Sequence, residues 1–369
     1  MTKTPKRIKI FGQIVLSIGM ILGLSACYPS HSQSTFDPNG PVAAAQLEIF
    51  WWILIGASIV FVLVEGILIY SIFKFSGKSE TYIPKQVHGN HKLEITWTLL
   101  PAIILVIIAI PTIDTLFYAA SPPKHALEQH TLEVIGHQWW FEFRYPNPYE
   151  NTKEIVTANE VYIPVGYPIS INLESVDVIH SFWVPKLAGK VDMVPSEGNS
   201  MWFQANEPGE YFGQCAEYCG TSHANMRFKV IAVPEPEYVA WLQYQASSAI
   251  ESTDPLALEG KNVFKSAGCS GCHSINSTIN KGSVGRIGPN LTHVASRRHL
   301  AAGVLMNSKN GGPVNDFYLQ NNLREWISDP ESIKPGNIMS AQAAVYTNSD
   351  RKLTEHEISA LVGYLTSLK

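Results

Sequence analysis

Two long apolar runs constrain the fold of this chain most strongly. Within its 369 residues, one run extends from Leu47 to Phe73 and the other from Ile95 to Tyr118. Each exceeds the ~20 residues that an α-helix needs to cross the hydrocarbon core of a membrane. Glu65 and Asp114 lie inside these runs, and polar groups at that depth usually face a protein partner. We therefore expect a transmembrane helical hairpin over residues 47–118.

The distribution of lysines predicts the orientation of this hairpin. The segment between the two runs carries Lys74, Lys78, Lys85 and Lys92, whereas the flanks on the other side carry Lys124 and little else. Positively charged loops remain in the cytoplasm. The long sequence that follows the second run is therefore expected outside the cytoplasm, on a chain that crosses the membrane twice.

The N-terminus has the features of a signal peptide. Basic residues precede a shorter apolar stretch, Ile10 to Leu24, which ends in Leu24-Ser25-Ala26-Cys27. A basic start, an apolar centre and small residues at the end are typical of secretory signals. The ending resembles a bacterial lipobox, which implies a lipoprotein signal peptide over 1–26, lipid attachment at Cys27 and an extracytoplasmic segment over 27–46. A third membrane helix with an incidental cysteine is the alternative.

The region after the second run changes from a strand pattern to a helix pattern. Short apolar runs separated by Pro and Gly fill 131–233 and favour an all-β sandwich or barrel. Residues 235–255 hold an amphipathic piece and a Ser-rich acidic stretch, which indicates a linker. From 256 onward, helical patterns cover Leu256–Ala267, Phe317–Ser328 and Leu353–Leu368, and Thr354 with Glu357 forms a capping box before the last one.

One segment of the β region carries a set of soft metal ligands. Cys215, Cys219, His223 and Met226 lie within a dozen residues, and sulfur with imidazole nitrogen favours copper. Two thiolates can bridge a pair of coppers that share one electron, so that little reorganises when the electron leaves. A disulfide is the alternative, but it would not explain the His and the Met. His180, at the end of an earlier apolar strand, is the candidate for a further ligand.

A second metal motif lies in the helical region. Cys269, Cys272 and His273 form a C-x-x-C-H run, in which two thiols attach a haem covalently and the His binds its iron. A disulfide is again the alternative. The formal net charge is −4, and no basic patch with interleaved aromatic residues indicates nucleic-acid binding.

These motifs together resemble subunit II of a bacterial haem-copper cytochrome c oxidase with a cytochrome c domain fused to its C-terminus. The resemblance covers essentially the whole chain and implies a multi-domain membrane protein. Its parts would be the two-helix transmembrane hairpin at 47–118, an all-β cupredoxin-like sandwich at 119–234, the linker at 235–255 and an all-α cytochrome c domain at 256–369. The segments that resemble the family most closely are Leu93-Glu94-Ile95-Thr96-Trp97, Gly136-His137-Gln138-Trp139-Trp140, the His180 strand, and Pro208 to Cys215.

The resemblance also implies a ligand set for a binuclear copper centre called CuA. Cys215 and Cys219 would bridge two coppers, and His180 and His223 would each bind one. Met226 and the backbone carbonyl of Glu217 would complete the site. The Glu217 carboxylate would reach a magnesium ion at the boundary with subunit I, which suits a cation that prefers oxygen.

Two further residues gain roles from the resemblance. Trp139 resembles the aromatic residue over which electrons reach the copper site in relatives without a fused haem, although a buried core Trp is the alternative. Glu94 resembles a carboxylate at the cytoplasmic mouth of a proton pathway into subunit I. A charge at a helix end is also commonly just solvated.

The sixth ligand of the haem iron is assigned to Met339. It stands where the family has its axial Met, in a Pro/Gly segment after a helix, although relatives commonly place Pro where this chain has Ser340. Met306 is the competing candidate, and either could be a core residue. Gly288-Pro289-Asn290-Leu291 resembles the segment that packs beside the haem-binding His.

The implied function is transfer of electrons into a proton-pumping cytochrome c oxidase in the bacterial plasma membrane. A donor cytochrome c or an upstream respiratory complex would reduce the covalent haem c, which would reduce CuA and then subunit I, where oxygen becomes water. Partners would be subunits I and III. This chain alone should reduce no oxygen. The alternatives are the corresponding subunit of a haem-copper nitric oxide reductase, or a membrane-anchored electron carrier without an oxidase.

Overall fold

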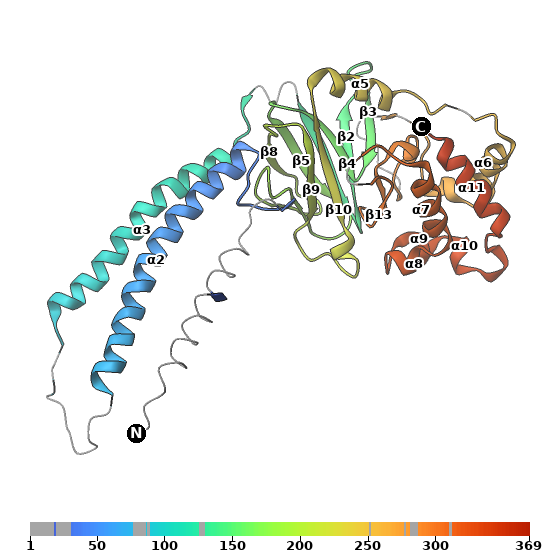
Figure 1. Ribbon diagram of the computed structural model, residues 1–369. Coiled ribbons are helices and arrows are strands. Elements are labelled where there is room, and N and C mark those ends of the chain that lie inside the picture. Colours follow the sequence, from blue (N-terminus) through green and yellow to red (C-terminus); the bar gives the residue numbers. More distant parts are fainter. Residues whose placement is uncertain are drawn as a thin grey trace.

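The structure is a computed structural model of the chain. It describes residues 18–19, 31–76, 86, 89–124, 130–250, 252–276, 278–280, 287–309 and 312–369. The predicted cleavage site of the signal peptide and the predicted lipid attachment site, Cys27, lie outside these residues. An elongated molecule results, with two long helices at one end, a β-sandwich in the middle and a helical domain at the other end (Figure 1).

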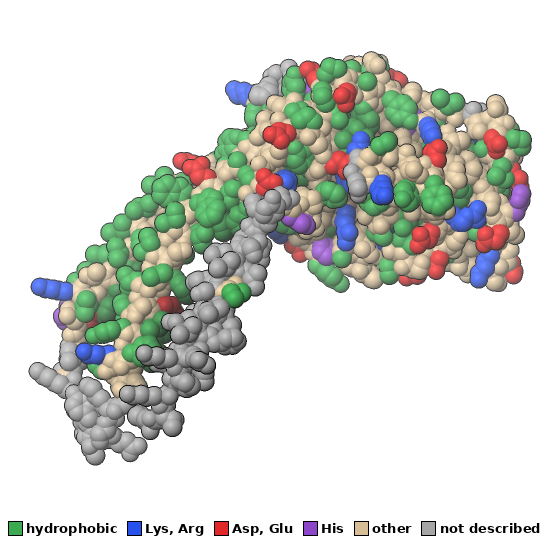
Figure 2. All heavy atoms as spheres, in the orientation of Figure 1, with side chains coloured by type: hydrophobic (Ala, Val, Ile, Leu, Met, Phe, Trp, Pro, Cys, Tyr) green, Lys and Arg blue, Asp and Glu red, His purple; other side chains and the backbone are tan. Residues whose placement is uncertain are grey.

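The two apolar runs form the long helices α2 (Pro41–Phe75) and α3 (His91–Ala120), which lie side by side. Both are long and apolar enough to cross a membrane, and each continues beyond the apolar run that predicted it. Their surfaces are covered with hydrophobic side chains (Figure 2). In the absence of a water-facing polar side, these surfaces are suited to lipid or to neighbouring membrane helices.

Both long helices are attached to the sandwich at their extracytoplasmic ends. At the start of α2, the Ala43 amide donates to the Leu187 carbonyl at 3.2 Å. At the end of α3, the Tyr118 carbonyl accepts a hydrogen bond of 3.0 Å from the Trp202 indole, and the two rings meet edge to face. These contacts hold the sandwich at one end of the helical hairpin.

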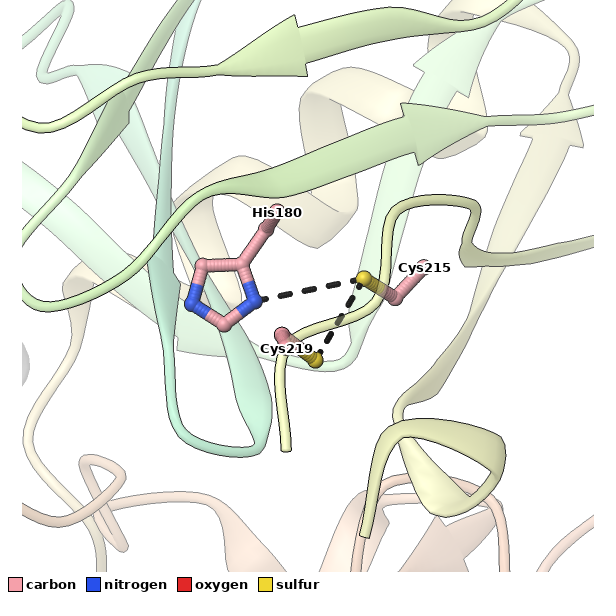
Figure 3. A group of neighbouring side chains, drawn as sticks. All are labelled: His180, Cys215 and Cys219. Carbon is pink, nitrogen blue, oxygen red and sulfur yellow. Dashed lines mark hydrogen bonds between the residues drawn. The ribbon is translucent and has the colours of Figure 1, made fainter. Parts of the chain in front are cut away.

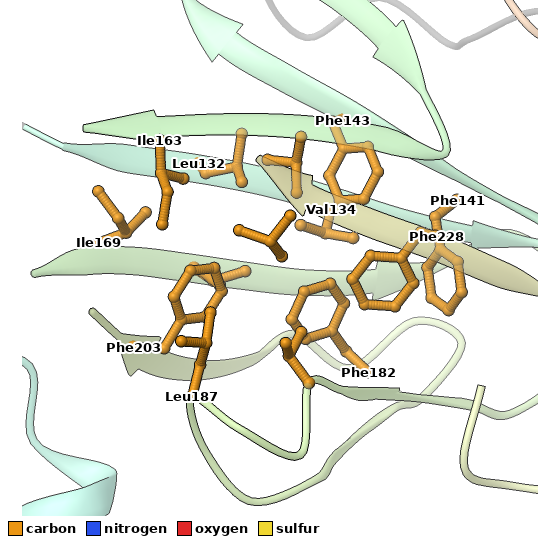
Figure 4. Close-up of a cluster of buried hydrophobic side chains, with 14 of the residues drawn as sticks. Leu132, Val134, Phe141, Phe143, Ile163, Ile169, Phe182, Leu187, Phe203 and Phe228 are labelled. Carbon is orange, nitrogen blue, oxygen red and sulfur yellow. The ribbon is translucent and has the colours of Figure 1, made fainter. Parts of the chain in front are cut away.

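The sandwich contains a six-stranded and a five-stranded sheet, in the orders β11-β3-β2-β1-β5-β8 and β4-β10-β9-β6-β7. Its core is a cluster of fully buried aromatic and aliphatic side chains between the sheets (Figure 4), among them Phe141, Phe182 and Phe228. The strands are β1 (Thr131–His137), β2 (Trp140–Pro146), β3 (Lys153–Ala158), β4 (Glu160–Pro164), β5 (Ile169–Ser175), β6 (His180–Trp183), β7 (Val191–Met193), β8 (Asn199–Phe203), β9 (Gly209–Cys215), β10 (Arg227–Val233) and β11 (Thr278–Asn280).

Strand pairing in the smaller sheet gathers the copper-ligand candidates at one end. Strand β6 pairs antiparallel with β9, with Phe182 opposite Cys215, so the start of β6 lies beside the end of β9. Strand β9 also pairs antiparallel with β10, with Gln214 opposite Arg227. The segment 216–226 is therefore the connection between two neighbouring strands, and it closes over His180.

Two features of the segments around the proposed linker go beyond the sequence expectation. Residues 235–246 form helix α5 (Glu235–Ala246), which packs on the sandwich through Trp241, stacked on Tyr162 at 4.4 Å, and through the buried Leu242. Strand β11, from the helical C-terminal region, pairs with β3 and extends the larger sheet. Both features join the C-terminal region to the sandwich.

The C-terminal region is mainly helical, as predicted. Helices α6 and α11 cross, α7 packs on α11, and the Thr354–Glu357 capping box starts α11. A small two-stranded sheet joins β12 and β13. The elements are α6 (Pro255–Ser266), η2 (Cys269–Gly271), η3 (Val294–Ser296), β12 (His299–Leu300), β13 (Leu305–Met306), α7 (Asp316–Ser328), α8 (Pro330–Ile333), α9 (Ile338–Gln342), α10 (Ala344–Thr347), η4 (Ser349–Arg351) and α11 (Glu355–Ser367).

Gly260 allows α6 and α11 to cross closely. A β-carbon at this position would collide with the Ala360 carbonyl, which is backbone and cannot rotate away. We expect Gly260→Ala to destabilise the helical domain by about 1–3 kcal/mol through overpacking, measured by thermal unfolding. The control is Gly363→Ala in α11, where the nearest atom would be 3.5 Å away. An unchanged melting temperature for Gly260→Ala would contradict this reading of the crossing.

Candidate copper centre and haem cavity

The two thiols of the copper motif lie close together but are not bonded. The Sγ atoms of Cys215 and Cys219 are 3.7 Å apart, whereas a disulfide bond is about 2.05 Å long. The Nδ1 atom of His180 is 3.9 Å from Cys215 Sγ, and the three side chains converge from β6, the end of β9 and the following loop (Figure 3). All three residues are buried. The arrangement is that of a ligand cluster.

The remaining candidate ligands surround the same two sulfurs. His223 Nδ1 lies 3.5 Å and Met226 Sδ 3.9 Å from Cys219 Sγ, while the Glu217 carbonyl lies 3.2 Å from Cys215 Sγ. Two ligand atoms that bind one ion tetrahedrally at 2.0–2.3 Å lie roughly 3.5 Å from each other. The donor set of two thiolates, two imidazoles and a thioether therefore fits copper in both geometry and chemistry.

The orientation of His180 is fixed by its neighbours. Its Nε2 atom is 2.7 Å from Asp177 Oδ1, which leaves Nδ1 directed at Cys215. Burial lowers the pKa of His180, but the contacts with Asp177 and Cys215 together outweigh burial, so that the pKa is raised overall. Gly136 packs against the other side of the ring, where a β-carbon would lie 2.7 Å from Cδ2. Such outer contacts commonly set the rotamer and basicity of a ligating His.

The thiol pair is electrostatically unsymmetrical. The hydrogen bond from Cys219, followed by that from His180, holds the pKa of Cys215 well below its usual range, to about 3. The same hydrogen bond raises the pKa of Cys219, because the Cys215 sulfur holds its proton, and burial adds to this shift. The two thiols therefore keep one proton between them. A bound metal ion would displace this proton, because a thiol that coordinates a metal is deprotonated.

The haem motif opens into a largely apolar cavity. Cys269, Cys272, His273 and Met339 all line it. The Nδ1 atom of His273 bonds the Pro289 carbonyl at 2.8 Å, and this contact leaves Nε2 available for iron. Burial lowers the pKa of His273, which favours the neutral form that binds metals. The residues fit a covalently attached haem with His and Met ligands.

The two candidate methionines differ in position. Met339 lies in the first turn of α9 and lines the cavity, whereas Met306 lies on β13, is 39% exposed and does not line it. Ser340, where relatives have Pro, donates a 2.6 Å hydrogen bond to Glu331, and its amide is capped by Asn337. These bonds stabilise the short helix that carries Met339.

Trp139 connects the two candidate sites. It is 7% exposed and belongs to the sandwich core, as the alternative from the sequence allowed. Its indole nitrogen also donates to the Cys219 carbonyl at 2.9 Å, and the ring lines the haem cavity. A β-carbon on Gly336, from the helical domain, would be 3.2 Å from the ring. The structure thus combines a core position with contacts to both sites.

Glu94 lies in the first turn of α3, and this helix extends away from the sandwich (Figure 1). Its Oε1 accepts from the Asn90 amide at 3.2 Å and its Oε2 is 3.2 Å from His91 Nδ1. These local contacts stabilise the start of the helix. A role of Glu94 in proton transfer stays a prediction.

Sequence reasoning did not identify three of the residues that support the copper loop. Gln138 Nε2 donates to the Cys219 carbonyl at 2.7 Å, and Asp177 accepts from the Gln138 amide at 2.7 Å. Lys334, from the helical domain, donates to the Trp139 carbonyl. Only Asp177 carried a local signal, because an Asp three residues before a candidate His ligand is placed to bond its ring.

Comparison with known proteins matches each part of the chain to a family. Residues 29–115 match the transmembrane domain of cytochrome c oxidase subunit II, residues 130–233 its periplasmic domain, and residues 257–369 cytochrome c. Among solved structures, the periplasmic domain of cytochrome oxidase subunit II from Bradyrhizobium japonicum is 29% identical, over 31% of this chain and 92% of that one, with a TM-score of 0.29.

Proteins that are similar over most of this chain are named cytochrome c oxidase subunit 2. Cytochrome c oxidase subunit 2 of Alkalihalophilus pseudofirmus is 39% identical over 95% of both chains, and that of Bacillus subtilis is 33% identical over 91% of this chain and 92% of the relative. The matches cover the membrane helices, the sandwich and the haem-motif domain. This chain therefore belongs to the cytochrome c oxidase subunit II family, in the form that carries a C-terminal cytochrome c domain.

Proposed function

We propose that this membrane-anchored subunit accepts electrons from a donor cytochrome c or an upstream respiratory complex at haem c and passes them through CuA to subunit I. The observation that supports this order is the contact between the domains. The Lys334–Gly336 segment touches Trp139, and Trp139 bonds the carbonyl of the candidate copper ligand Cys219. The haem cavity and the copper loop thus share one aromatic side chain.

In this proposal the residues of the chain hold the two redox groups and keep water away from them. Copper and haem iron supply the one-electron chemistry. His180, Cys215, Cys219, His223, Met226 and the Glu217 carbonyl hold the copper pair. Cys269 and Cys272 attach the haem, and His273 and Met339 hold its iron. Because Cys215, Cys219 and Met226 are at most 4% exposed, little solvent has to reorganise when charge moves.

Several further features of the proposal concern the complex. As an oxidase subunit II, the chain partners subunit I, and we propose that subunit III joins them and that oxygen reduction is coupled to proton pumping in a bacterial plasma membrane. Glu94 would then stand at the mouth of a proton pathway, and the Glu217 carboxylate would reach a magnesium ion shared with subunit I. Lipid attachment at Cys27 is proposed from the lipobox resemblance.

Purification of the native complex tests this function. We expect two coppers and one covalent haem in this chain, by elemental analysis and by haem staining after denaturing electrophoresis. The complex should consume oxygen, but not nitric oxide, when a reduced donor is supplied. Rapid consumption of nitric oxide without oxygen uptake would assign the chain to a reductase, and recovery without a large subunit would indicate a free electron carrier. Either result would contradict the proposal.

A further inference from the structure

The haem cavity is formed by both extracytoplasmic domains. Most of its lining is apolar and comes from the helical domain, but Gln138, Trp139, Trp140 and Asn159 contribute from the sandwich. Trp140 is buried in a small cluster with Ala158 and with Ala302 of the helical domain. The haem attached in this cavity would therefore have one edge against the copper-binding domain.

The polar part of the cavity contains a buried cation with no acidic partner. Lys334 lines the cavity and is 4% exposed. Its Nζ donates to the backbone carbonyls of Trp139 and, at 3.3 Å, of Ala301. Among the described residues it forms no ion pair, and burial lowers the pKa of its ammonium group to about 7. The charge of the nearby Cys219 thiol acts in the opposite direction on this pKa. No carboxylate among the described residues pairs with the ammonium group, and a buried charge without such a partner is costly.

A second cation, Arg297, lines the same cavity. Its guanidinium donates to the Asn290 carbonyl, and burial lowers its pKa to about 10. The nearby acid Glu160 is buried and has its pKa raised to about 7, again by burial. It accepts from the His299 amide at 3.1 Å. Arg297 thus has only a weakly ionised acid near it.

The acidic residue Glu210 at the domain boundary is already paired. It contacts two other cations, Lys229 at 2.8 Å and Arg298. Arg297 and Lys334, which line the cavity, form no ion pair among the described residues. A haem carries two carboxylates, which would give each of these two cations a partner.

His299 adds unpartnered hydrogen-bonding atoms to the same cavity. It is 2% exposed, and neither ring nitrogen has a hydrogen-bond partner among the described residues. Its Nε2 is 3.6 Å from Glu160 Oε1, which is beyond hydrogen-bonding distance. Burial lowers its pKa to about 3, so the ring is neutral and can donate one hydrogen bond. Buried polar atoms of this kind normally have a partner.

We propose that Lys334, Arg297 and His299 form a carboxylate-binding subsite, closed by Trp139 and Trp140, that holds the haem carboxylates at the boundary between the two domains. This inference rests on the proposed covalent haem. It orients the polar edge of the haem toward Trp139, and hence toward the carbonyl of Cys219. It also makes the haem part of the domain interface, because residues of both domains line its cavity.

The test compares Lys334→Met and Lys334→Arg in the full chain within the native complex. The readouts are the haem c reduction potential and the resonance Raman bending band of the haem carboxylates, which responds to their hydrogen bonding. Loss of a nearby cation favours oxidised haem. At a fixed ambient potential we expect the ratio of reduced to oxidised haem to fall about tenfold in Lys334→Met, equivalent to about 59 mV, together with a shifted Raman band.

The controls separate charge from structure. Lys334→Arg should keep both readouts near wild type, as should Lys352→Met, which removes an exposed lysine elsewhere on the same domain. If Lys334→Met does not accumulate, Lys334→Gln, which retains a hydrogen-bond donor without the charge, should give the same fall in potential. An unchanged potential and Raman band in the uncharged variant would overturn the subsite. Absence of covalent haem from the wild-type chain would instead overturn the proposed function.

Discussion

Cys219→Ser should remove the paired copper centre and leave at most one copper bound. Cys219 Sγ has three other candidate ligands around it, namely Cys215 at 3.7 Å, His223 at 3.5 Å and Met226 at 3.9 Å. A serine hydroxyl is a hard and weakly acidic ligand, so it cannot replace a bridging thiolate on copper. Removing outer contacts of a metal site costs 10–100-fold in affinity or activity, and loss of the bridge should cost more than about 100-fold in electron transfer from haem c.

Copper content and electron paramagnetic resonance of the purified complex measure this change directly. Met226→Leu is the graded comparison, because it removes a single weak ligand and should retain two coppers with an altered spectrum. Tyr218→Phe is the matched control, since Tyr218 is 76% exposed beside the same cysteine and the change removes no candidate ligand. Two coppers with the wild-type spectrum in Cys219→Ser would refute the bridging role.

The sequence predicted the candidate ligands because their chemistry is concentrated in short segments. Residue type and spacing identify four candidate donors between Cys215 and Met226. They also identify the three residues of the haem motif. His180 required one further step, the expectation that an earlier strand of a cupredoxin-like sandwich supplies one ligand. The antiparallel pairing of β6 with β9 provides that neighbour relation.

The supporting contacts could not be predicted, because they join residues far apart in the chain. Lys334 and Trp139 are 195 positions apart, and the pairing of β11 with β3 joins segments assigned to different domains. Helix α5 illustrates the same limit on a smaller scale. Its sequence resembles a linker, but in the structure Trp241 stacks on Tyr162 of the sandwich and holds the helix there. Such contacts depend on how whole elements dock, which local patterns do not encode.

Exchange of the sixth iron ligand should produce the second large effect. Met339→His should keep the haem attached through Cys269 and Cys272 but replace the thioether with an imidazole, a stronger donor to ferric iron. A Met/His pair raises the reduction potential of a haem, so the potential of haem c should fall. Axial ligands span a range of ~0.8 V, and a decrease of at least about 100 mV is expected.

This change should affect one step of the electron path. A haem of lower potential still transfers its electron downhill to copper, but it accepts one less readily from the donor. Steady-state oxygen consumption should therefore fall at the donor step, while the copper spectrum stays unaltered. Redox titration of the haem absorption and stopped-flow reduction by the donor separate these two quantities.

Met306→His provides the matched comparison for Met339→His. Met306 is 39% exposed on β13 and outside the haem cavity, so the same substitution there should leave the potential nearly unchanged. The thioether of Met339 reaches the cavity from the first turn of α9, where Asn337 caps the helix. If Met306→His lowers the potential and Met339→His does not, the axial ligand is Met306, and α9 serves only to close the cavity around a haem still held by Cys269, Cys272 and His273.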